Sequence, residues 1–257
     1  MTTTRHDGRV AGRRILVTGA ASGIGLATCR LLLEEGASVA MLDRDATGLQ
    51  AAAAELDNAG GAFTVDVAEQ AQVQSAVTAA AAFMGGIDGV VNGAGIARRG
   101  DFAEVLTSDW LATLGVNLNG PFFVCQAALP FLREAGAGTI VNIASGVALR
   151  PIAGSTAYAA SKGGLIAFGK ALAVELAPMN IRVNTVCPGI VETPMIRRRI
   201  EGAPDPQAEA HRLFERRLLK RFGQPEEIAH AILFLTADDC AYVTASVFAI
   251  DGGGTMY

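Results

Sequence analysis

Tyr158 and Lys162 lie four positions apart in a chain of 257 residues that contains three tyrosines and three lysines. With so few of each, a tyrosine followed four positions later by a lysine is expected only about 0.035 times by chance. Residues four apart share one face of a helix. A phenol with a pKa near 10 is a poor base at neutral pH, and a neighbouring ammonium group favours its ionised form. The pair therefore predicts a general acid and base, with Lys162 lowering the pKa of Tyr158.

A third polar side chain, Ser145, stands thirteen residues before Tyr158 and just after the apolar run 139–143. Parallel sheets present their ligands at the carboxyl ends of the strands. A hydroxyl group there reaches a substrate oxygen and stabilises the negative charge that develops on it. Ser145, Tyr158 and Lys162 are therefore the predicted centre of the chemistry.

A glycine-rich loop, Thr18-Gly-Ala-Ala-Ser-Gly-Ile-Gly25, follows the first apolar run and opens a helical stretch. Its glycines permit a tight turn and a close approach to a pyrophosphate, while helix N–H groups face the anion. The spacing alone is weak, because about 0.4 matches are expected by chance at this glycine content. The strand-loop-helix context is what favours a dinucleotide site, which would include Gly19, Ser22, Gly23, Ile24 and Gly25.

Asp43 ends the second apolar run, eighteen residues after Gly25. This is where a dinucleotide fold places the carboxylate that binds the ribose 2′-hydroxyl. A carboxylate repels a 2′-phosphate, so NAD is favoured over NADP. Arg44 leaves NADP open, because a guanidinium group can neutralise that phosphate or stack on the adenine.

The elements that must position these residues alternate along the chain. Apolar runs typical of strands buried on both faces of a parallel sheet lie at 15–18, 38–42, 63–65, 89–92, 139–143, 182–186 and 246–250. Stretches long enough for crossover helices lie at 23–35, 46–58, 69–84, 107–134, 155–176 and 225–235. The alternation predicts an α/β fold: a right-handed, doubly wound parallel sheet of about seven strands with helices on both faces.

No linker marks a second domain, so we expect one domain over residues 1–257. The segment 192–224 differs from the rest, because it is charged, rich in arginine and interrupted by Pro194, Pro204 and Pro206. It follows a strand end, where open sheets bind ligands. Two interpretations stay open: a mobile lid over the substrate and a solvated helical excursion.

Composition argues against several other classes. The formal net charge of −4 does not suit a general nucleic-acid binder. The four cysteines are far apart and form no zinc or dithiol motif, and we expect them to be buried free thiols in a reducing compartment. No window has the ~18 uninterrupted apolar residues of a spanning helix. We expect a cytoplasmic protein with no metal, no nucleic-acid partner and no membrane segment.

The motifs together resemble the short-chain dehydrogenase/reductase family, whose fold is of the Rossmann type. The resemblance covers nearly the whole chain and adds Asp66-Val67, Asn92-Gly-Ala-Gly95, Asn117, Pro188-Gly189 and Asp251-Gly-Gly253 to the motifs above. It implies cofactor contacts by Asp66, Val67, Asn92, Ala94, Gly95, Tyr158, Lys162, Pro188, Gly189, Val191 and Thr193. It also implies that Asn117 joins the catalytic residues Ser145, Tyr158 and Lys162 by holding a water that links Lys162 to solvent. A homotetramer is implied as well.

Two positions depart from the family pattern. Gly93 stands where relatives usually have a second Asn, and Ala245 stands where a Gly commonly follows the Thr. We expect looser hydrogen bonding behind the cofactor at the first position and a small structural effect at the second.

The resemblance implies an NAD(H)-dependent oxidoreductase that interconverts a secondary alcohol and a ketone, with Tyr158 moving the proton. Residues 221–228 are similar to NADPH-dependent 3-oxoacyl thioester reductases, but Gly136 and Met179 stand where such enzymes commonly carry docking arginines. A non-catalytic dinucleotide-binding sensor is the other alternative. Such a sensor would not need Ser145, Asn117, Tyr158 and Lys162 together.

The substrate is expected to contact Ser145, Val147, Ile152, Tyr158 and Met195, with Ala148 also lining the pocket and Arg150 close by. These residues predict an apolar pocket for a hydrophobic ketone or secondary alcohol. The basic residues Arg197, Arg198, Arg199, Arg216, Arg217, Lys220 and Arg221 either clasp an anionic group or form salt bridges with Glu192, Glu201 and Glu215 on a solvated lid.

Overall fold

The structure, a computed structural model, describes residues 8–57, 59–215 and 217–256. Two positions named above, Asn58 at the end of a predicted helix and Arg216 in the arginine-rich segment, lie outside the described residues. No helix in the described ranges is long and apolar enough to cross a membrane.

Seven parallel strands form one sheet in the order β3-β2-β1-β4-β5-β6-β7. Their bounds are β1 Arg14–Thr18, β2 Ser38–Asp43, β3 Gly61–Thr64, β4 Gly89–Asn92, β5 Gly138–Ile143, β6 Ile181–Pro188 and β7 Val247–Ile250. Every residue of β4 and β5 is buried, as expected for unbroken apolar runs in the middle of a parallel sheet. The doubly wound sheet predicted from the sequence is confirmed.

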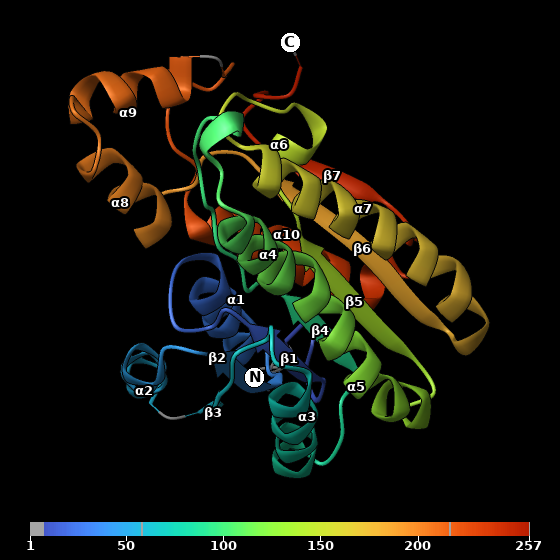
Figure 1. Cartoon of the computed structure of the whole chain (residues 1–257). Helices are drawn as coiled ribbons and strands as arrows, with labels where there is room; N and C mark the ends of the chain where they lie inside the picture. The colour runs from blue at the N-terminus through green and yellow to red at the C-terminus, as the bar shows by residue number, and fades with distance from the viewer. Residues whose placement is uncertain (1–7, 58, 216, 257) are drawn as a thin grey trace, which may run out of the picture.

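Helices cover both faces of this sheet. Packed on one face are α3 (Gln70–Met84), α4 (Thr107–Leu114), α5 (Gly120–Glu134) and α7 (Thr156–Leu176), and on the other α1 (Gly23–Glu34), α2 (Ala46–Glu55) and α10 (Pro225–Thr236). Figure 1 shows α4, α5 and α7 running across the near side of the sheet. Neighbouring residues of β1 serve the two cores, because Leu16 belongs to one cluster and Val17 to the other.

The chain predicted as one helix over 107–134 is interrupted. The π-helical segment η2 (Gly115–Asn119) separates α4 from α5, and the N–H of Gly120 donates to the carbonyl of Gly115 five residues earlier. Pro121 explains part of the break, because it has no N–H for the carbonyl four residues back, that of Asn117. Insertions of this type occur frequently at functional sites, and this one contains Asn117.

The arginine-rich segment forms two short helices, α8 (Pro194–Glu201) and α9 (Pro206–Glu215), which Figure 1 shows in orange, standing apart from the sheet. Backbone hydrogen bonds join the two ends of this segment. The N–H of Glu192 donates to the carbonyl of Gly223 (2.8 Å), and the N–H of Gly223 donates to the carbonyl of Ile190 (2.9 Å). The helices thus form an excursion that starts and returns beside the end of β6.

Three further turns complete the chain: α6 (Gly146–Leu149) after β5, η1 (Phe102–Glu104) after β4, and η3 (Ala177–Met179) before β6. A fourth, η4 (Asp238–Cys240), precedes β7. Between η4 and β7, Ala245 has a φ of 56°, in the left-handed region that favours glycine. Glycine would suit this turn better, and we expect alanine to cost about 1 kcal/mol here.

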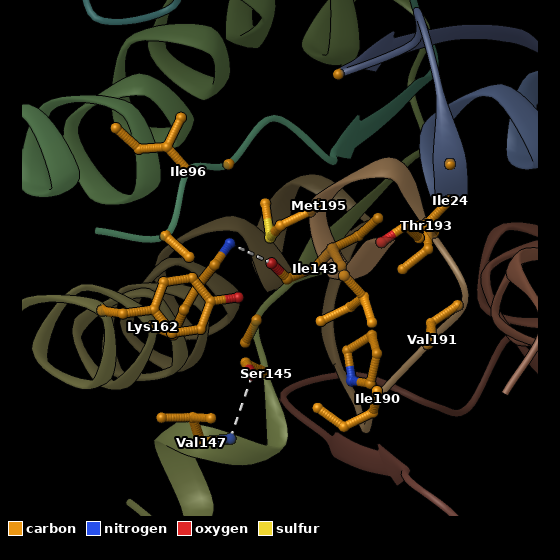
Figure 2. A pocket seen from close by; sticks show the side chains of 18 of the residues that line it. Ile24, Ile96, Ile143, Ser145, Val147, Lys162, Ile190, Val191, Thr193 and Met195 are labelled. Atoms are coloured by element: carbon orange, nitrogen blue, oxygen red, sulfur yellow. Dashed lines mark hydrogen bonds between the residues drawn. The ribbon is translucent and has the colours of Figure 1, made fainter. Parts of the chain in front are cut away.

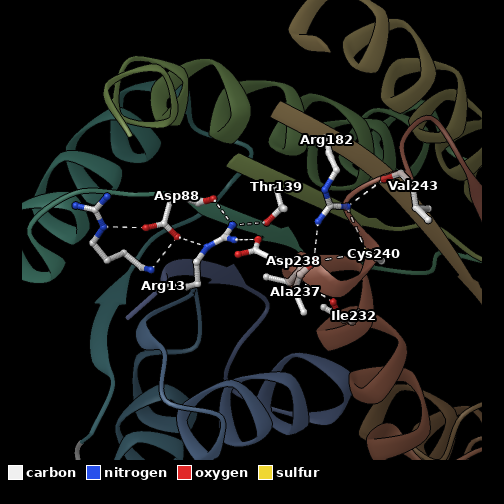
Figure 3. Close-up of polar contacts among 11 residues, drawn as sticks. Arg13, Asp88, Thr139, Arg182, Ile232, Ala237, Asp238, Cys240 and Val243 are labelled. Atoms are coloured by element: carbon white, nitrogen blue, oxygen red, sulfur yellow. Dashed lines mark hydrogen bonds and ion pairs between the residues drawn. The ribbon is translucent and has the colours of Figure 1, made fainter. Parts of the chain in front are cut away.

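Asp88 fastens the amino-terminal edge of the sheet, opposite the carboxyl ends of the strands. Its carboxylate accepts hydrogen bonds from Nε of Arg13, Nε of Arg14 and the N–H of Arg14, each at 2.9 Å. Figure 3 shows this network, in which Arg13 also reaches the carbonyl of Asp88 and the carboxylate of Asp238. Only 12% of the Asp88 side chain is exposed. The network joins the start of β1 to the start of β4.

Asp88→Ala is expected to lower the free energy of unfolding by about 2–4 kcal/mol, because it leaves the guanidinium group of Arg14 without a carboxylate and that of Arg13 with only the exposed carboxylate of Asp238. Asp239→Ala is the matched control. Its ion pair with Arg9 is exposed on both sides, so a loss below about 1 kcal/mol is expected. Urea unfolding of the two variants measures the difference, and equal losses would contradict a structural role for Asp88.

Candidate active site

A cavity of about 1300 Å³ runs along the carboxyl ends of the strands. All seven strands contribute to its lining through their last residues or the loops that follow, and α8 and α9 close one side. Pockets of ~300–1,000 Å³ hold a drug-sized ligand. This cavity has room for a dinucleotide and a substrate together.

The glycine-rich loop forms one end of the cavity. Gly19 has a φ of 72°, and a Cβ there would lie 2.7 Å from the backbone nitrogen of Ala94. A Cβ at Gly25 would overlap the carbonyl of Gly19. Ser22 makes no side-chain cap to α1, and the first turn of that helix has no acidic residue. The helix therefore presents uncapped N–H groups to the cavity, which fits the pyrophosphate of a dinucleotide.

Asp43 lies at the edge of the same end. Its carboxylate accepts hydrogen bonds from the N–H of Ala21 (3.1 Å) and the N–H of Asp45 (3.0 Å), which fix its orientation. Asp45 and Asp66 also line this end, where the positive charge is that of Arg44. The surplus of carboxylates suits a ribose hydroxyl better than a 2′-phosphate.

Most of the other predicted cofactor residues line the cavity: Asp66, Val67, Ala94, Gly95, Pro188, Gly189, Val191 and Thr193. Asn92 does not. Its side-chain amide donates to Oδ1 of Asn142 (2.8 Å) and to Sγ of Cys125 (3.3 Å), inside the protein. The side chain of Asn92 thus ties β4 to β5 beneath the cavity, and a cofactor contact by this residue stays a prediction.

Gly93 does not loosen the hydrogen bonding behind this end. Its N–H and that of Ala94 both donate to Oγ1 of Thr18 at 3.1 Å. A Cβ at Gly93 would lie 2.6 Å from the carbonyl oxygen of Thr18. A second Asn at this position would thus require the backbone to move.

Ser145, Tyr158 and Lys162 meet in the middle of the cavity lining. Ser145 follows β5, and its hydroxyl accepts a hydrogen bond from the N–H of Val147 at the start of α6 (3.2 Å). Tyr158 and Lys162 are one turn apart on α7. Figure 2 shows the Lys162 amine directed at the carbonyl of Ile143, with 2.7 Å between nitrogen and oxygen. The structure thus brings together the three side chains that the sequence singles out.

The pKa of Tyr158 is set mainly by burial, which raises it above the usual value of a phenol. Hydrogen bonding by Ser145 and the positive charge of Arg99 lower it by smaller amounts. The sequence predicts that Lys162 lowers this pKa, but in the protein alone the lysine is not among the groups that set it. Arg99 supplies the charge instead, and Tyr158 is protonated at neutral pH.

Asn117 occupies the π-helical segment, fully buried and outside the cavity lining. Its Oδ1 accepts from the N–H of Ile96, and its Nδ2 donates to the carbonyl of Ile96 and to Oγ of Ser161, at 2.9–3.0 Å. The side chain is therefore occupied in holding the loop after β4 against α7. Its expected catalytic role, holding a water that links Lys162 to solvent, stays a prediction.

Lys162 carries a charge that its surroundings disfavour. Its side chain is buried, and the described residues offer it a carbonyl but no carboxylate within ion-pair distance. Burial lowers its pKa to about 8. A charged lysine therefore weakens the folded state, an arrangement found where function rather than stability fixes a residue.

Lys162→Met is expected to stabilise the protein without cofactor by about 1–3 kcal/mol at pH 7, because methionine fills similar space without a buried charge. The folded-state pKa lies below the ordinary value, so wild-type stability rises as the pH increases from about 8 toward 10.5. The difference in stability between Lys162→Met and wild type therefore becomes smaller over the same pH range. Thermal unfolding at several pH values measures it.

The control for that variant is Lys170→Met, which removes an exposed lysine from the same helix. It should change stability by less than about 0.5 kcal/mol. A Lys162→Met protein that is no more stable than wild type at pH 7 would show that the charge is not disfavoured.

The predicted substrate residues line the far end of the cavity with one exception. Val147, Ile152 and Met195 contribute to the lining together with Ser145 and Tyr158, and Arg150 lies beside them. Ala148 is not part of the lining. Figure 2 shows Val147 near Ser145 and Met195 on the side of α8. The sequence predicts an apolar pocket, but only some of the residues that line this end are apolar.

Sequence reasoning missed several residues of this end, among them Arg99, Arg212, Leu213 and Asp251. Arg99 belongs to the loop after β4, only four residues beyond Gly95. That loop follows a strand end, which is where parallel sheets bind ligands, and this signal could have identified it. Arg212 and Leu213 lie on α9, and nothing local in the sequence indicates that they face the cavity.

The basic residues of 192–224 divide between the two expectations. Arg197 pairs with Glu192 (3.0 Å), Arg221 pairs with Glu227 (2.7 Å), and Lys220 bonds the carbonyl of Glu215. Arg198, Arg199 and Arg217 line the cavity instead. The segment is thus a solvated surface on one side and a cavity wall on the other.

Comparison with known proteins identifies the family. A family model described as "Enoyl-(Acyl carrier protein) reductase" matches residues 19–255. The chain is 41% identical over 248 residues to a 3-oxoacyl-(acyl-carrier-protein) reductase of Thermotoga maritima, covering 95% of this chain and 98% of the relative. It is 41% identical over 255 residues to D-threitol dehydrogenase of Mycolicibacterium smegmatis, covering 97% and 95%.

A solved structure, that of levodione reductase, superposes with a TM-score of 0.92 at 33% identity, covering 96% of this chain and 98% of that one. The parallel sheet, the glycine loop at one end of its cavity and the Tyr158 and Lys162 pair at the centre agree with these matches. The chain belongs to the short-chain dehydrogenase/reductase family.

Proposed function

We propose that this chain is an NAD-dependent oxidoreductase that interconverts a secondary alcohol and a ketone. The observation that carries the proposal is the meeting of Ser145, Tyr158 and Lys162 in one cavity with the glycine loop of α1. The names of two similar proteins, a dehydrogenase of D-threitol and a reductase of levodione, support the same reaction class.

The residues divide the work of the reaction. The hydroxyl of Ser145 hydrogen-bonds the substrate oxygen and stabilises the charge that develops there. Tyr158 gives a proton to that oxygen in carbonyl reduction and takes it in alcohol oxidation. The amine of Lys162 donates a hydrogen bond to the carbonyl of Ile143 at the end of β5 and so fixes the cavity wall between Ser145 and Tyr158. When bound, a nicotinamide dinucleotide supplies the hydride acceptor or donor and, in its oxidised form, a positive charge that favours ionised Tyr158.

The choice of NAD rests on Asp43. Its carboxylate is held by two backbone N–H groups at the edge of the cavity, beside two further acidic residues, Asp45 and Asp66. A 2′-phosphate would meet this charge, and Arg44 alone would have to offset it. Ala20 and Ala21 add no positive charge in the loop.

Domain organisation, location and assembly complete the proposal. We treat residues 1–257 as one catalytic domain, with 192–224 as a lid whose base is fixed and whose helices open and close. The four cysteines are buried free thiols, which supports a reducing, cytoplasmic setting. Exposed Leu111, Phe122 and Val174, on α4, α5 and α7, support a homotetramer that covers these helices.

A second candidate is the NADPH-dependent reduction of 3-oxoacyl thioesters, favoured by the identity to the Thermotoga maritima reductase. One assay separates the candidates: a panel of secondary alcohols with NAD and NADP, beside ketones and a 3-oxoacyl thioester with NADH and NADPH. Turnover of alcohols with NAD, or of ketones with NADH, supports our proposal. Turnover of the thioester alone with NADPH supports the second candidate, and cofactor binding without any turnover supports a sensor.

A further inference from the structure

Arginine side chains gather at the substrate end of the cavity. Besides Arg98, which pairs with Asp109 at 3.7 Å, the lining includes Arg99, Arg150, Arg198, Arg199, Arg212 and Arg217. They come from the loop after β4, the end of α6, α8, α9 and the loop between α9 and α10. Asp251 is the acidic residue of the described lining at this end. A cleft lined by one sign of charge raises the local concentration of ligands of the opposite sign.

Neighbouring groups cancel only part of this charge. Arg199 and Arg212 share the carboxylate of Glu209, at 2.7 and 2.8 Å. Asp251 accepts hydrogen bonds from the N–H groups of Gly253 (2.9 Å) and Thr255 (2.8 Å), so its own loop uses its oxygens. Within the described parts of the chain, Arg99, Arg198 and Arg217 have no carboxylate at ion-pair distance.

Two buried donors on these arginines are unused. Nη1 of Arg199 and Nε of Arg217 are buried without a hydrogen-bond partner among the described residues. Only 15% of the Arg199 side chain is exposed. A buried N–H without an acceptor costs about 1–3 kcal/mol, and native proteins rarely keep one without a reason. Both residues line the cavity, which makes an acceptor that enters with the substrate the simplest reason.

The arginines also act on one another and on the reacting phenol. Burial and the charge of Arg199 lower the pKa of Arg99, while Tyr158 raises it. Burial lowers the pKa of Arg217 as well, with Asp251 opposing and Arg199 adding to the effect. These arginines and Tyr158 line one cavity, so a molecule bound there can contact both.

We infer that the substrate of the proposed oxidoreductase is an anion, a secondary alcohol or ketone that carries a carboxylate, sulfonate or phosphate bound by Arg199 and Arg217 with Arg99 beside them. The inference rests on the proposed function, because it names the substrate class of that same site. Guanidinium groups bind such oxyanions in a bidentate manner and keep their charge when partly buried. Arg199 also bridges α8 and α9 through Glu209, so an anion on its free donor would draw both helices over the site.

The experiment compares matched substrates. Methyl secondary alcohols that end in a carboxylate, at several chain lengths, are assayed beside their primary amides, with sulfonate and phosphate counterparts as further arms. We expect the best acid to exceed its amide in kcat/KM by about 30-fold or more, mainly through KM. The KM of the acid should rise with ionic strength while that of the amide stays constant. The substrate with the highest kcat/KM among the carboxylate, the sulfonate and the phosphate identifies the anionic group that the site binds.

Two variants locate the effect. Arg217→Gln should lower kcat/KM for the acid by about 10- to 100-fold and leave the amide within about threefold. Arg197→Gln is the control, because it removes an arginine of the same segment that is exposed, paired with Glu192 and outside the cavity lining. It should leave both substrates unchanged.

A binding measurement keeps the two proposals separate. Calorimetry of the oxo acid and its amide with wild type and Arg217→Gln reports the anion site without turnover. Turnover of amides as good as that of acids overturns this inference and leaves the oxidoreductase standing. Absence of turnover with arginine-dependent binding of the acid overturns the oxidoreductase and supports the anion site. Absence of both overturns both.

Discussion

Tyr158→Phe is expected to fold, to bind NADH as wild type does, and to lose about a thousandfold of kcat. The variant removes one oxygen from a side chain that lines the cavity beside Ser145. General acid or base catalysis by a positioned side chain contributes about 10²–10⁴-fold. Steady-state kinetics in both directions measure the loss, and cofactor fluorescence measures binding.

The control is Tyr242→Phe, which changes a fully exposed tyrosine that is not part of the cavity lining. Its activity should equal that of wild type. The pH dependence of wild type gives a second check. Because the protonated phenol is the donor, carbonyl reduction should fall as the pH rises through the pKa of Tyr158, while alcohol oxidation should increase. A Tyr158→Phe protein within a few-fold of wild type would remove Tyr158 from the mechanism.

Asp43→Asn is expected to change the ratio of kcat/KM for NAD over NADP by about 100-fold in favour of NADP. Ala21 and Asp45 donate to different oxygens of the carboxylate, so the single amide oxygen keeps an acceptor for one of the two N–H groups and the loop loses one hydrogen bond. What is lost is the negative charge that repels a 2′-phosphate, and Arg44 is then free to pair with it. Initial rates with both cofactors at one fixed substrate concentration give the ratio.

Asp45→Asn is the matched control for Asp43→Asn. Asp45 lines the same end of the cavity and caps α2 by accepting from the N–H of Gly48. Asparagine caps a helix nearly as well as aspartate, so the cofactor ratio should stay within about threefold. Equal effects of the two substitutions would mean that only the overall charge of this end matters.

The sheet could be predicted because its sequence signal is local. Runs such as 89–92 and 139–143 are apolar throughout, and a strand buried on both faces has no other pattern available. The observed strands β4 and β5 begin and end within one residue of those runs. The interruption of 107–134 could not be predicted in the same way, because a π-helical insertion depends on what Asn117 contacts across the fold as well as on Pro121.

The same distinction between local sequence signals and long-range contacts applies to the candidate site. Tyr158 and Lys162 could be found because their relation is a helical turn, and the glycine loop because it follows a strand directly. The arginine cluster depends on contacts between segments that are distant in sequence, Arg99 after β4 and Arg217 after α9. Such contacts leave no periodic trace in either segment. The side chains of Asn92 and Asn117 likewise form hydrogen bonds inside the protein and do not line the cavity.

The most direct test of the account follows the hydride itself. The best alcohol of the panel is prepared with deuterium on its carbinol carbon and incubated with NAD and the enzyme, and the reduced cofactor is analysed by mass spectrometry. The account predicts one deuterium in each molecule of NADH formed by wild type and almost no product from Tyr158→Phe. Reduced cofactor without the label, or equal label transfer by the variant, would contradict it.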